Sequence, residues 1–153
     1  MTSLEERLKR LEDRDAIHQL FVDYGRHLDS GDINAYAALF TEDGEVMLGP
    51  LGRTQGRDNI RALMGKVLAN RVGSSYHVIS SPRVEIDGDR ATSEVMWTVI
   101  QRDPDGKPRL TSLGRHVDQL RRESGVWRIA ERRGYVDLPQ RLPTVNADTH
   151  QVD

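Results

Sequence analysis

The chain has 153 residues, 37% of them hydrophobic and 30% charged, so we expect a single soluble domain with its own core. Its net charge of −2, with 22 basic residues spread among 24 acidic ones, gives no basis for binding nucleic acid or an anionic membrane. The chain has no cysteine, which excludes disulfides and thiolate chemistry. The charged N-terminus and the lack of a long apolar run predict a cytoplasmic protein without a membrane span.

The first half of the chain is predicted to be mainly helical. Apolar residues at helical spacing indicate one amphipathic helix, or two joined near residues 13–15, that ends at Ser30-Gly31. These apolar residues are Leu4, Leu8, Leu11, Ile17, Leu20, Phe21, Tyr24 and Leu28. Asp32 is a typical N-cap for a short second helix. A turn is expected at residues 41–44, short strands at 45–49 and 53–56, and a third helix at 57–70.

The second half is predicted to be β structure. Alternating residues at 75–86, 90–102, 110–122 and 126–138 indicate four long antiparallel strands, the first two joined by the hairpin signal Asp87-Gly88-Asp89. Residues 1–138 are thus expected to form the domain, and residues 139–153 a tail or an arm onto a neighbouring subunit. Segregated helices and strands predict an α+β fold, in which a strongly curved, mostly antiparallel sheet wraps the N-terminal helices and leaves an internal apolar cavity.

Three residues stand out chemically. Tyr24 lies on the apolar face of the first helix, so it is either an ordinary core tyrosine or a donor to a substrate oxygen. Asp29 falls in the last helical turn, where the helix dipole disfavours an anion by about 0.3–1 kcal/mol. It is therefore either an ordinary turn aspartate or an aspartate whose negative charge is stabilised by a nearby cation or by free backbone amides. His77 lies in a predicted strand, and no histidine has metal-ligand spacing, so no metal site is expected.

The order of these segments resembles the SnoaL-like branch of the nuclear transport factor 2-like (cone-fold) superfamily. The resemblance covers residues 4–138 and rests on LEERLKRLEDRDAIHQLFVDYGRHLDSGD, LFTEDGEV, GRDNI, SSYHVISSPRVEIDGDRA and GRHVDQLRRESGVWRIAERRGYVDLP. This branch includes hexachlorocyclohexane dehydrochlorinase, bile-acid 7α-dehydratase, scytalone dehydratase and polyketide cyclases. The resemblance implies a cone-shaped α+β barrel.

The resemblance also implies a set of catalytic residues. Asp29 and His77 occupy the positions of an aspartate and a histidine that pair in the dehydrochlorinase-like and bile-acid-dehydratase-like members. Tyr24 matches a tyrosine that acts five residues before that aspartate. Arg132 matches an arginine on the last strand, with Arg133 as the adjacent alternative.

Three further residues are expected to bind substrate. Trp97 is expected to form an aromatic wall of the cavity, and His27 to reach the cavity mouth. His116 stands where related chains often carry an aromatic residue, although alternation alone does not decide which side of its strand faces inward.

The leading hypothesis is a cofactor-independent lyase or isomerase, similar to a dehydratase. It would act on a small cyclic, largely apolar substrate, polyketide-like or steroid-like, through proton abstraction by a His-Asp base. The alternatives are a polyketide cyclase with the same base and a non-catalytic module that binds a hydrophobic ligand. We also expect a homo-oligomer, a trimer or a dimer, because an open sheet needs its outer face covered.

Overall fold

The computed structural model describes residues 3–138, so the predicted tail at 139–153 lies outside the described residues. Its helices are α1 (Leu4–Ser30), α2 (Ile33–Ala38) and α3 (Arg57–Leu68), with a short 3-10 turn at Gly49–Leu51. The strands are β1 (Phe40–Leu48), β2 (Arg53–Gln55), β3 (Ser75–Asp87), β4 (Arg90–Arg102), β5 (Pro108–Glu123) and β6 (Val126–Leu138).

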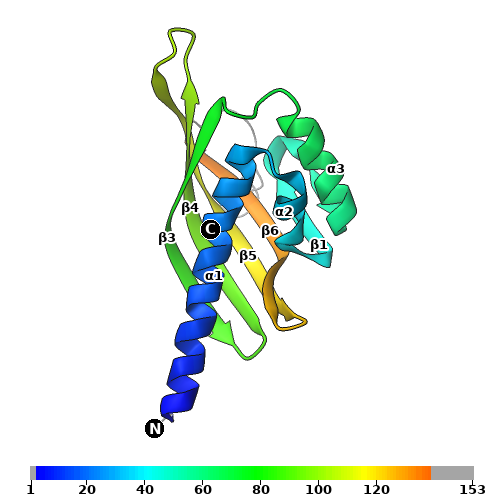
Figure 1. Ribbon diagram of the computed structural model, residues 1–153, viewed down its shortest axis with the longest axis vertical. Helices are drawn as coiled ribbons and strands as arrows, with labels where there is room; N and C mark the ends of the chain where they lie inside the picture. The colour runs from blue at the N-terminus through cyan, green and yellow to red at the C-terminus, as the bar shows by residue number, and fades with distance from the viewer. Residues whose placement is uncertain (1–2, 139–153) are drawn as a thin grey trace, which may run out of the picture.

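Helix α1 is a single helix rather than two (Figure 1). It starts with a capping box, in which the Ser3 side chain accepts from the Glu6 N–H and the Glu6 carboxylate accepts from the Ser3 N–H. Leu4, Leu8 and Leu11 do not share the buried face of the helix. At 3.6 residues per turn they lie roughly 150° around it from the buried residues, which begin at Asp13. The expectation of one apolar face is therefore wrong for the first three turns.

The turn expected at residues 41–44 lies instead within strand β1. The register between β1 and β6 shifts between Phe40 and Glu45, so the polar residues form an irregularity in a strand that continues on both sides. Gly44 is needed there, because a Cβ at this position would lie 3.0 Å from the Thr41 carbonyl oxygen. The tertiary pairing with β6 outweighs the local turn signal.

The six strands form one curved, mixed sheet in the order β2-β1-β6-β5-β4-β3. The pairs β3–β4, β4–β5, β5–β6 and β1–β2 are antiparallel, whereas β1 and β6 are parallel. The predicted α+β class and the four long antiparallel strands are thus confirmed, but the sheet is open rather than closed into a barrel. Figure 1 shows α1 lying across the concave side of the sheet, with α2 and α3 beside β1.

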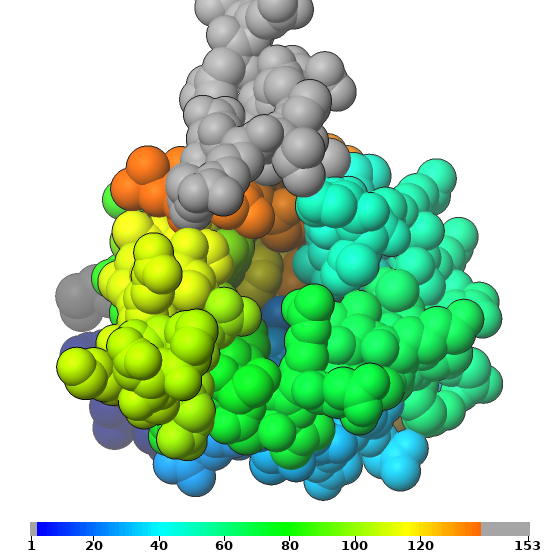
Figure 2. Space-filling view, turned by 90° about the horizontal axis from the view of Figure 1, so that it is seen from above, coloured from blue at the N-terminus to red at the C-terminus, as the bar shows by residue number. Residues whose placement is uncertain are grey.

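The core lies between α1, α2, α3 and the inner face of the sheet. Its centre is aromatic and aliphatic: Ile17, Tyr36, Phe40, Val46 and Ile129 are fully buried. Figure 2 looks onto the end that carries the β4–β5 hairpin and shows a hollow between β6 (orange), that hairpin (yellow-green) and the segment before β3 (green). Within residues 3–138, no helix is long and apolar enough to cross a membrane.

Candidate active site

The structure brings Asp29 and His77 together. The His77 ring Nδ1 lies 2.6 Å from Asp29 Oδ1. The backbone N–H of His77 also donates to both carboxylate oxygens, at 3.1 and 3.0 Å. Both side chains are mostly buried, with 19% of the His77 side chain and 15% of the Asp29 side chain exposed. One carboxylate therefore holds both the ring and the backbone of the histidine.

Two glycines of the α1 region allow this contact. Gly25, one turn before Asp29, lets α1 approach β3, because a Cβ there would lie 3.4 Å from the His77 carbonyl oxygen and 3.2 Å from Ile79 Cγ1. Gly31 ends the helix with φ 74°, and its N–H bonds to the His27 and Leu28 carbonyls. The helix therefore stops directly after the turn that carries Asp29.

These contacts define the chemistry that the pair can perform. A carboxylate accepts hydrogen bonds only, so the ring nitrogen that faces it carries the proton. The opposite nitrogen, Nε2, makes no hydrogen bond to any other residue of the described chain, so it is the nitrogen that carries the lone pair when the ring is neutral. The charge of Asp29 at the negative helix end is offset by the backbone amide and ring of His77, rather than by the amides of the following turn. In such an arrangement a histidine can act as an oriented general base.

A cluster of aromatic side chains lies beside the pair. The Tyr24 ring is 5.4 Å from the Tyr36 ring and 5.2 Å from the His116 ring, and Trp97 lies 5.9 Å from His116. Burial raises the pKa of Tyr24, with Arg132 opposing the shift, so its hydroxyl stays protonated and remains a donor. His116 therefore faces inward, which alternation alone left open.

His116 is held neutral by its surroundings. Burial lowers its pKa well below the usual range, and the charge of Arg132 and the proximity of His77 lower it further. Its Nδ1 is buried without a hydrogen-bond partner among the described residues, as is Trp97 Nε1. Trp97 lies over Gly114 of the neighbouring strand, where any Cβ would clash with its indole ring. Each of these side chains thus carries a buried polar atom that no described residue satisfies.

Arg132, not Arg133, points inward. It donates from Nε and Nη2 to the two oxygens of Asp118, at 2.8 and 2.7 Å, and both side chains are fully buried. Its guanidinium carbon lies 4.2 Å from the centre of the Tyr24 ring. Burial lowers the pKa of Arg132, but Asp118 outweighs burial and the net shift is upward. Arg133 is instead half exposed and paired with Glu131.

The remaining expected residue, His27, is not brought into this group. It is half-buried on α1, and no hydrogen bond, ion pair or ring contact of residues 3–138 joins its side chain to the pair or to the aromatic cluster. Sequence reasoning in turn missed Tyr36 and Asp118. An inward acidic residue on β5 could have been suspected from the alternation His116, Asp118, Leu120, but its partner depends on strand register.

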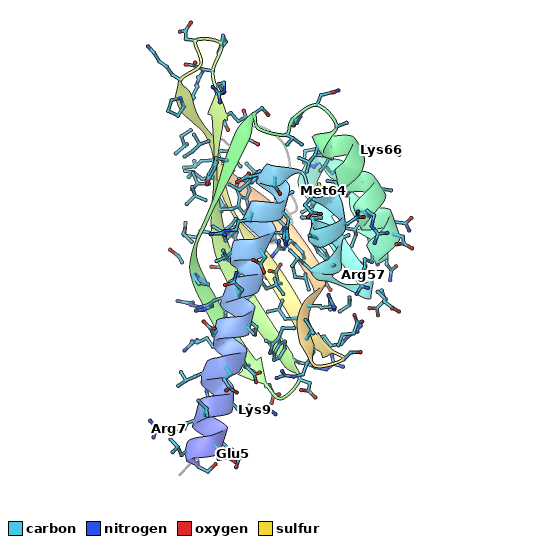
Figure 3. All side chains as sticks on the ribbon, viewed as in Figure 1. Glu5, Arg7, Lys9, Arg57, Met64 and Lys66 are labelled. Atoms are coloured by element: carbon cyan, nitrogen blue, oxygen red, sulfur yellow. The ribbon has the colours of Figure 1, made fainter. Side chains whose placement is uncertain are left out.

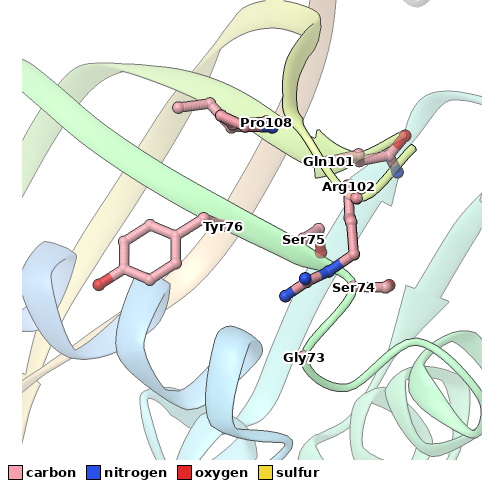
Figure 4. A pocket seen from close by; sticks show the side chains of 9 residues that line it. Gly73, Ser74, Ser75, Tyr76, Gln101, Arg102 and Pro108 are labelled. Atoms are coloured by element: carbon pink, nitrogen blue, oxygen red, sulfur yellow. The ribbon is translucent and has the colours of Figure 1, made fainter. Parts of the chain in front are cut away.

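Two surface pockets lie near Asp29 and His77. One is a groove between α1 and β3, lined in part by Val22, Gly25, Asp29 and His77. A second pocket lies at the start of β3, where Ser74, Tyr76, Arg102 and Pro108 contribute to its wall (Figure 4). It contains neither member of the pair. Within residues 3–138, no group of three or more His, Cys, Asp or Glu side chains is placed to hold a metal ion.

Comparison with known proteins supplies the family. A profile of the SnoaL-like domain matches residues 9–133 of this chain. No curated protein sequence matches it. An NTF2-like protein with a cystatin-like fold from Novosphingobium aromaticivorans is 28% identical, with a TM-score of 0.80 over 92% of this chain and 94% of that one.

Two further structures show the same fold. Rv3472 of Mycobacterium tuberculosis, described as of unknown function, is 27% identical, with a TM-score of 0.77 over 84% of this chain and 74% of that one. A hexachlorocyclohexane dehydrochlorinase, LinA type 2, is 20% identical, with a TM-score of 0.76 over 86% of this chain and 89% of that one. At that identity the likeness concerns the fold alone.

Proposed function

Because this chain belongs to the SnoaL-like domain family, we propose that it is a cofactor-independent lyase or isomerase whose general base is His77, oriented by Asp29. Membership of this family supports this class of reaction. The observation that carries the proposal is the 2.6 Å contact from His77 Nδ1 to Asp29, with Nε2 left without a partner among the described residues. The chain has no cysteine, and no serine hydroxyl of residues 3–138 hydrogen-bonds to His77, so we infer that the pair moves protons rather than forming an acyl-enzyme.

The reaction we propose is the dehydration of a β-hydroxy ketone. His77 Nε2 takes a proton from the carbon between the carbonyl and the hydroxyl-bearing carbon, and the C–H electron pair forms the new C=C bond. The C–O bond to the hydroxyl breaks, and the hydroxyl leaves as water with a proton returned from the imidazolium. The imidazolium is stabilised by the carboxylate of Asp29. With a β,γ-unsaturated ketone, the same base would remove the α proton and the imidazolium would return it to the γ carbon of the dienolate, which moves the C=C bond and gives an isomerisation.

Tyr24 is the proposed donor to the substrate oxygen. Its raised pKa keeps the hydroxyl protonated. The Tyr24 ring lies against the His116 ring. His77 lowers the pKa of His116, so His77 lies near this pair of rings. Arg132 has a different role, because it is fully buried and its charge is paired with Asp118. It is proposed as a positioning residue, because its guanidinium lies against the Tyr24 ring. Its Nη1 is buried and has no hydrogen-bond partner among the described residues, so it also remains a candidate donor to a substrate oxygen.

The walls of the site favour a neutral, largely apolar substrate. Trp97 and the neutral His116 offer flat surfaces suited to a cyclic compound. Arg132 is neutralised by Asp118, so no unpaired cation of this group is available to bind a carboxylate or phosphate. A polyketide-like or steroid-like ring system fits these properties.

The proposal is tested with a panel of cyclic β-hydroxy ketones, following the absorbance of the conjugated enone. We expect His77→Ala to abolish turnover and Asp29→Asn to lower kcat by about 10²–10⁴-fold. His18→Ala is the control, because His18 lies on α1, the helix that carries Asp29, but outside the candidate active site; it should leave kcat unchanged. Equal turnover by wild type and His77→Ala would overturn the assignment of the base.

A further inference from the structure

The N-terminal part of α1 projects beyond the sheet and carries an unpartnered row of leucines. Leu4, Leu8 and Leu11 are 78%, 54% and 64% exposed. Figure 1 shows this end of α1 extending past the β3–β4 hairpin, and Figure 3 shows Glu5, Arg7 and Lys9 around it. The capping box at Ser3 keeps the helix intact to its first residue. A preformed helix thus presents an apolar row that the described chain does not cover, and such patches mark interaction sites.

The spacing of the row is that of a coiled coil. Leu4, Leu8 and Leu11 are separated by four and three residues, which corresponds to heptad positions d, a and d. We call these three residues the leucine seam. The seam lies roughly 150° around the helix from the face that packs on the sheet, so it is open to a second helix. Leu11, at its end, also borders a surface pocket that β3 lines with Val84 and Ile86.

The charges beside the seam indicate what covers it. With Leu8 at position a, Arg7 takes position g and Glu12 takes position e. In a parallel pair of identical helices, a residue at g faces the e residue five positions later on the partner, so Arg7 meets Glu12 of the other copy on both sides. In an antiparallel pair, g would face g and the two arginines would repel. Neither residue takes part in an ion pair within residues 3–138, and both are exposed.

The next seam position limits the length of the contact. Asp15 would face its own copy across the axis, and two like charges there repel. The body of the domain also begins at this level, where Asp13 is buried and accepts hydrogen bonds from Arg122 and Trp127. Two helices paired at the seam would therefore separate at Asp15. Because the contact spans fewer than two heptads, we expect a weak dimer that is populated only at high protein concentration.

We propose that the leucine seam is a docking surface for a second copy of this chain, joined as a parallel pair in which Arg7 faces Glu12 of the other copy. The proposal is independent of the chemistry at His77, because the seam lies outside the candidate active site. It gives the chain a self-association surface other than the outer face of the sheet.

The chain has no cysteine, so single cysteines report the pairing directly. In a parallel pair, position 11 faces its own copy, and Leu11→Cys should form a disulfide-linked dimer under mild oxidation. Lys9→Cys is the matched control, because its side chain lies on another face of the same turn and should give at least tenfold less dimer. The proposal is overturned if both variants cross-link equally, or if Leu11→Cys does not cross-link at any concentration tested.

A charge exchange tests the orientation. In the Leu11→Cys background, Arg7→Glu alone and Glu12→Arg alone should each lower the yield of linked dimer several-fold, because like charges then meet. Mixing the two variants should restore the yield and give mainly the mixed dimer, which intact mass distinguishes. The double variant Arg7→Glu/Glu12→Arg should cross-link as well as the parent. If the mixture gives no preference for the mixed dimer, the parallel pairing is wrong.

Discussion

Replacing Asp118 by asparagine is expected to destabilise the domain by about 3–5 kcal/mol, because it leaves the fully buried guanidinium of Arg132 without its counter-charge. The carboxylate accepts from Nε and Nη2 at 2.8 and 2.7 Å, and the Ser93 hydroxyl donates to the same group at 3.4 Å. In a domain whose total stability is about 5–15 kcal/mol, this loss is large. It corresponds to a fall in Tm of about 6–20 °C at this chain length. Urea denaturation followed by circular dichroism measures it.

A double-mutant cycle separates the pair from its surroundings. Arg132→Gln should also be strongly destabilising, whereas the double variant Asp118→Asn/Arg132→Gln should cost less than the sum by about 2 kcal/mol or more, since no charge is then left unpaired. The exposed pair of Arg133 and Glu131 provides the control, and Glu131→Gln should cost less than about 1 kcal/mol. If Asp118→Asn costs no more than Glu131→Gln, the buried pair does not exist as described.

Two further perturbations follow from the same part of the fold. Gly114→Ala should destabilise the domain by about 3 kcal/mol, because its Cβ would meet the Tyr135 carbonyl oxygen and the Trp97 ring. Gly65→Ala on α3 is the control and should stabilise the domain by about 0.5–1 kcal/mol, because the space around it is open. Denaturation curves that rank the two variants the other way would refute the packing. His116 is buried with a lowered pKa, so below about pH 6.5 the unfolded chain binds a proton that the folded chain does not, and the free energy of unfolding should fall by up to about 1.4 kcal/mol per pH unit. In His116→Gln, the free energy of unfolding should depend less on pH when it is measured by denaturation from pH 7 to 5. An unchanged pH dependence would show that another group causes it.

Much of the fold could be predicted from local patterns. The long strands alternate with period two and are separated by turn signals such as Asp87-Gly88-Asp89, so β3 to β6 were expected close to where they lie. The failures have non-local causes. Residues 41–44 form part of β1 because β6 pairs with it, and this pairing cannot be read from the turn residues themselves.

The candidate site was predictable only in part. Helical spacing placed Tyr24 inward, and the resemblance to a family placed Asp29 opposite His77. The pairing of Arg132 with Asp118 depends on the register of β5 against β6, which the sequence alone does not specify. Gly25 illustrates the same limit, because its importance arises only from the close approach of α1 to β3.

The tautomer of His77 tests the central claim most directly. Long-range ¹H–¹⁵N correlation spectra at neutral pH should show the His77 proton on Nδ1 and a lone pair on Nε2, because Nδ1 faces Asp29 at 2.6 Å. In Asp29→Asn the amide no longer enforces this tautomer, and the strongly hydrogen-bonded Nδ1 proton should be lost. A wild-type spectrum with the proton on Nε2 would contradict the account, since the nitrogen assigned as the base would then carry no lone pair.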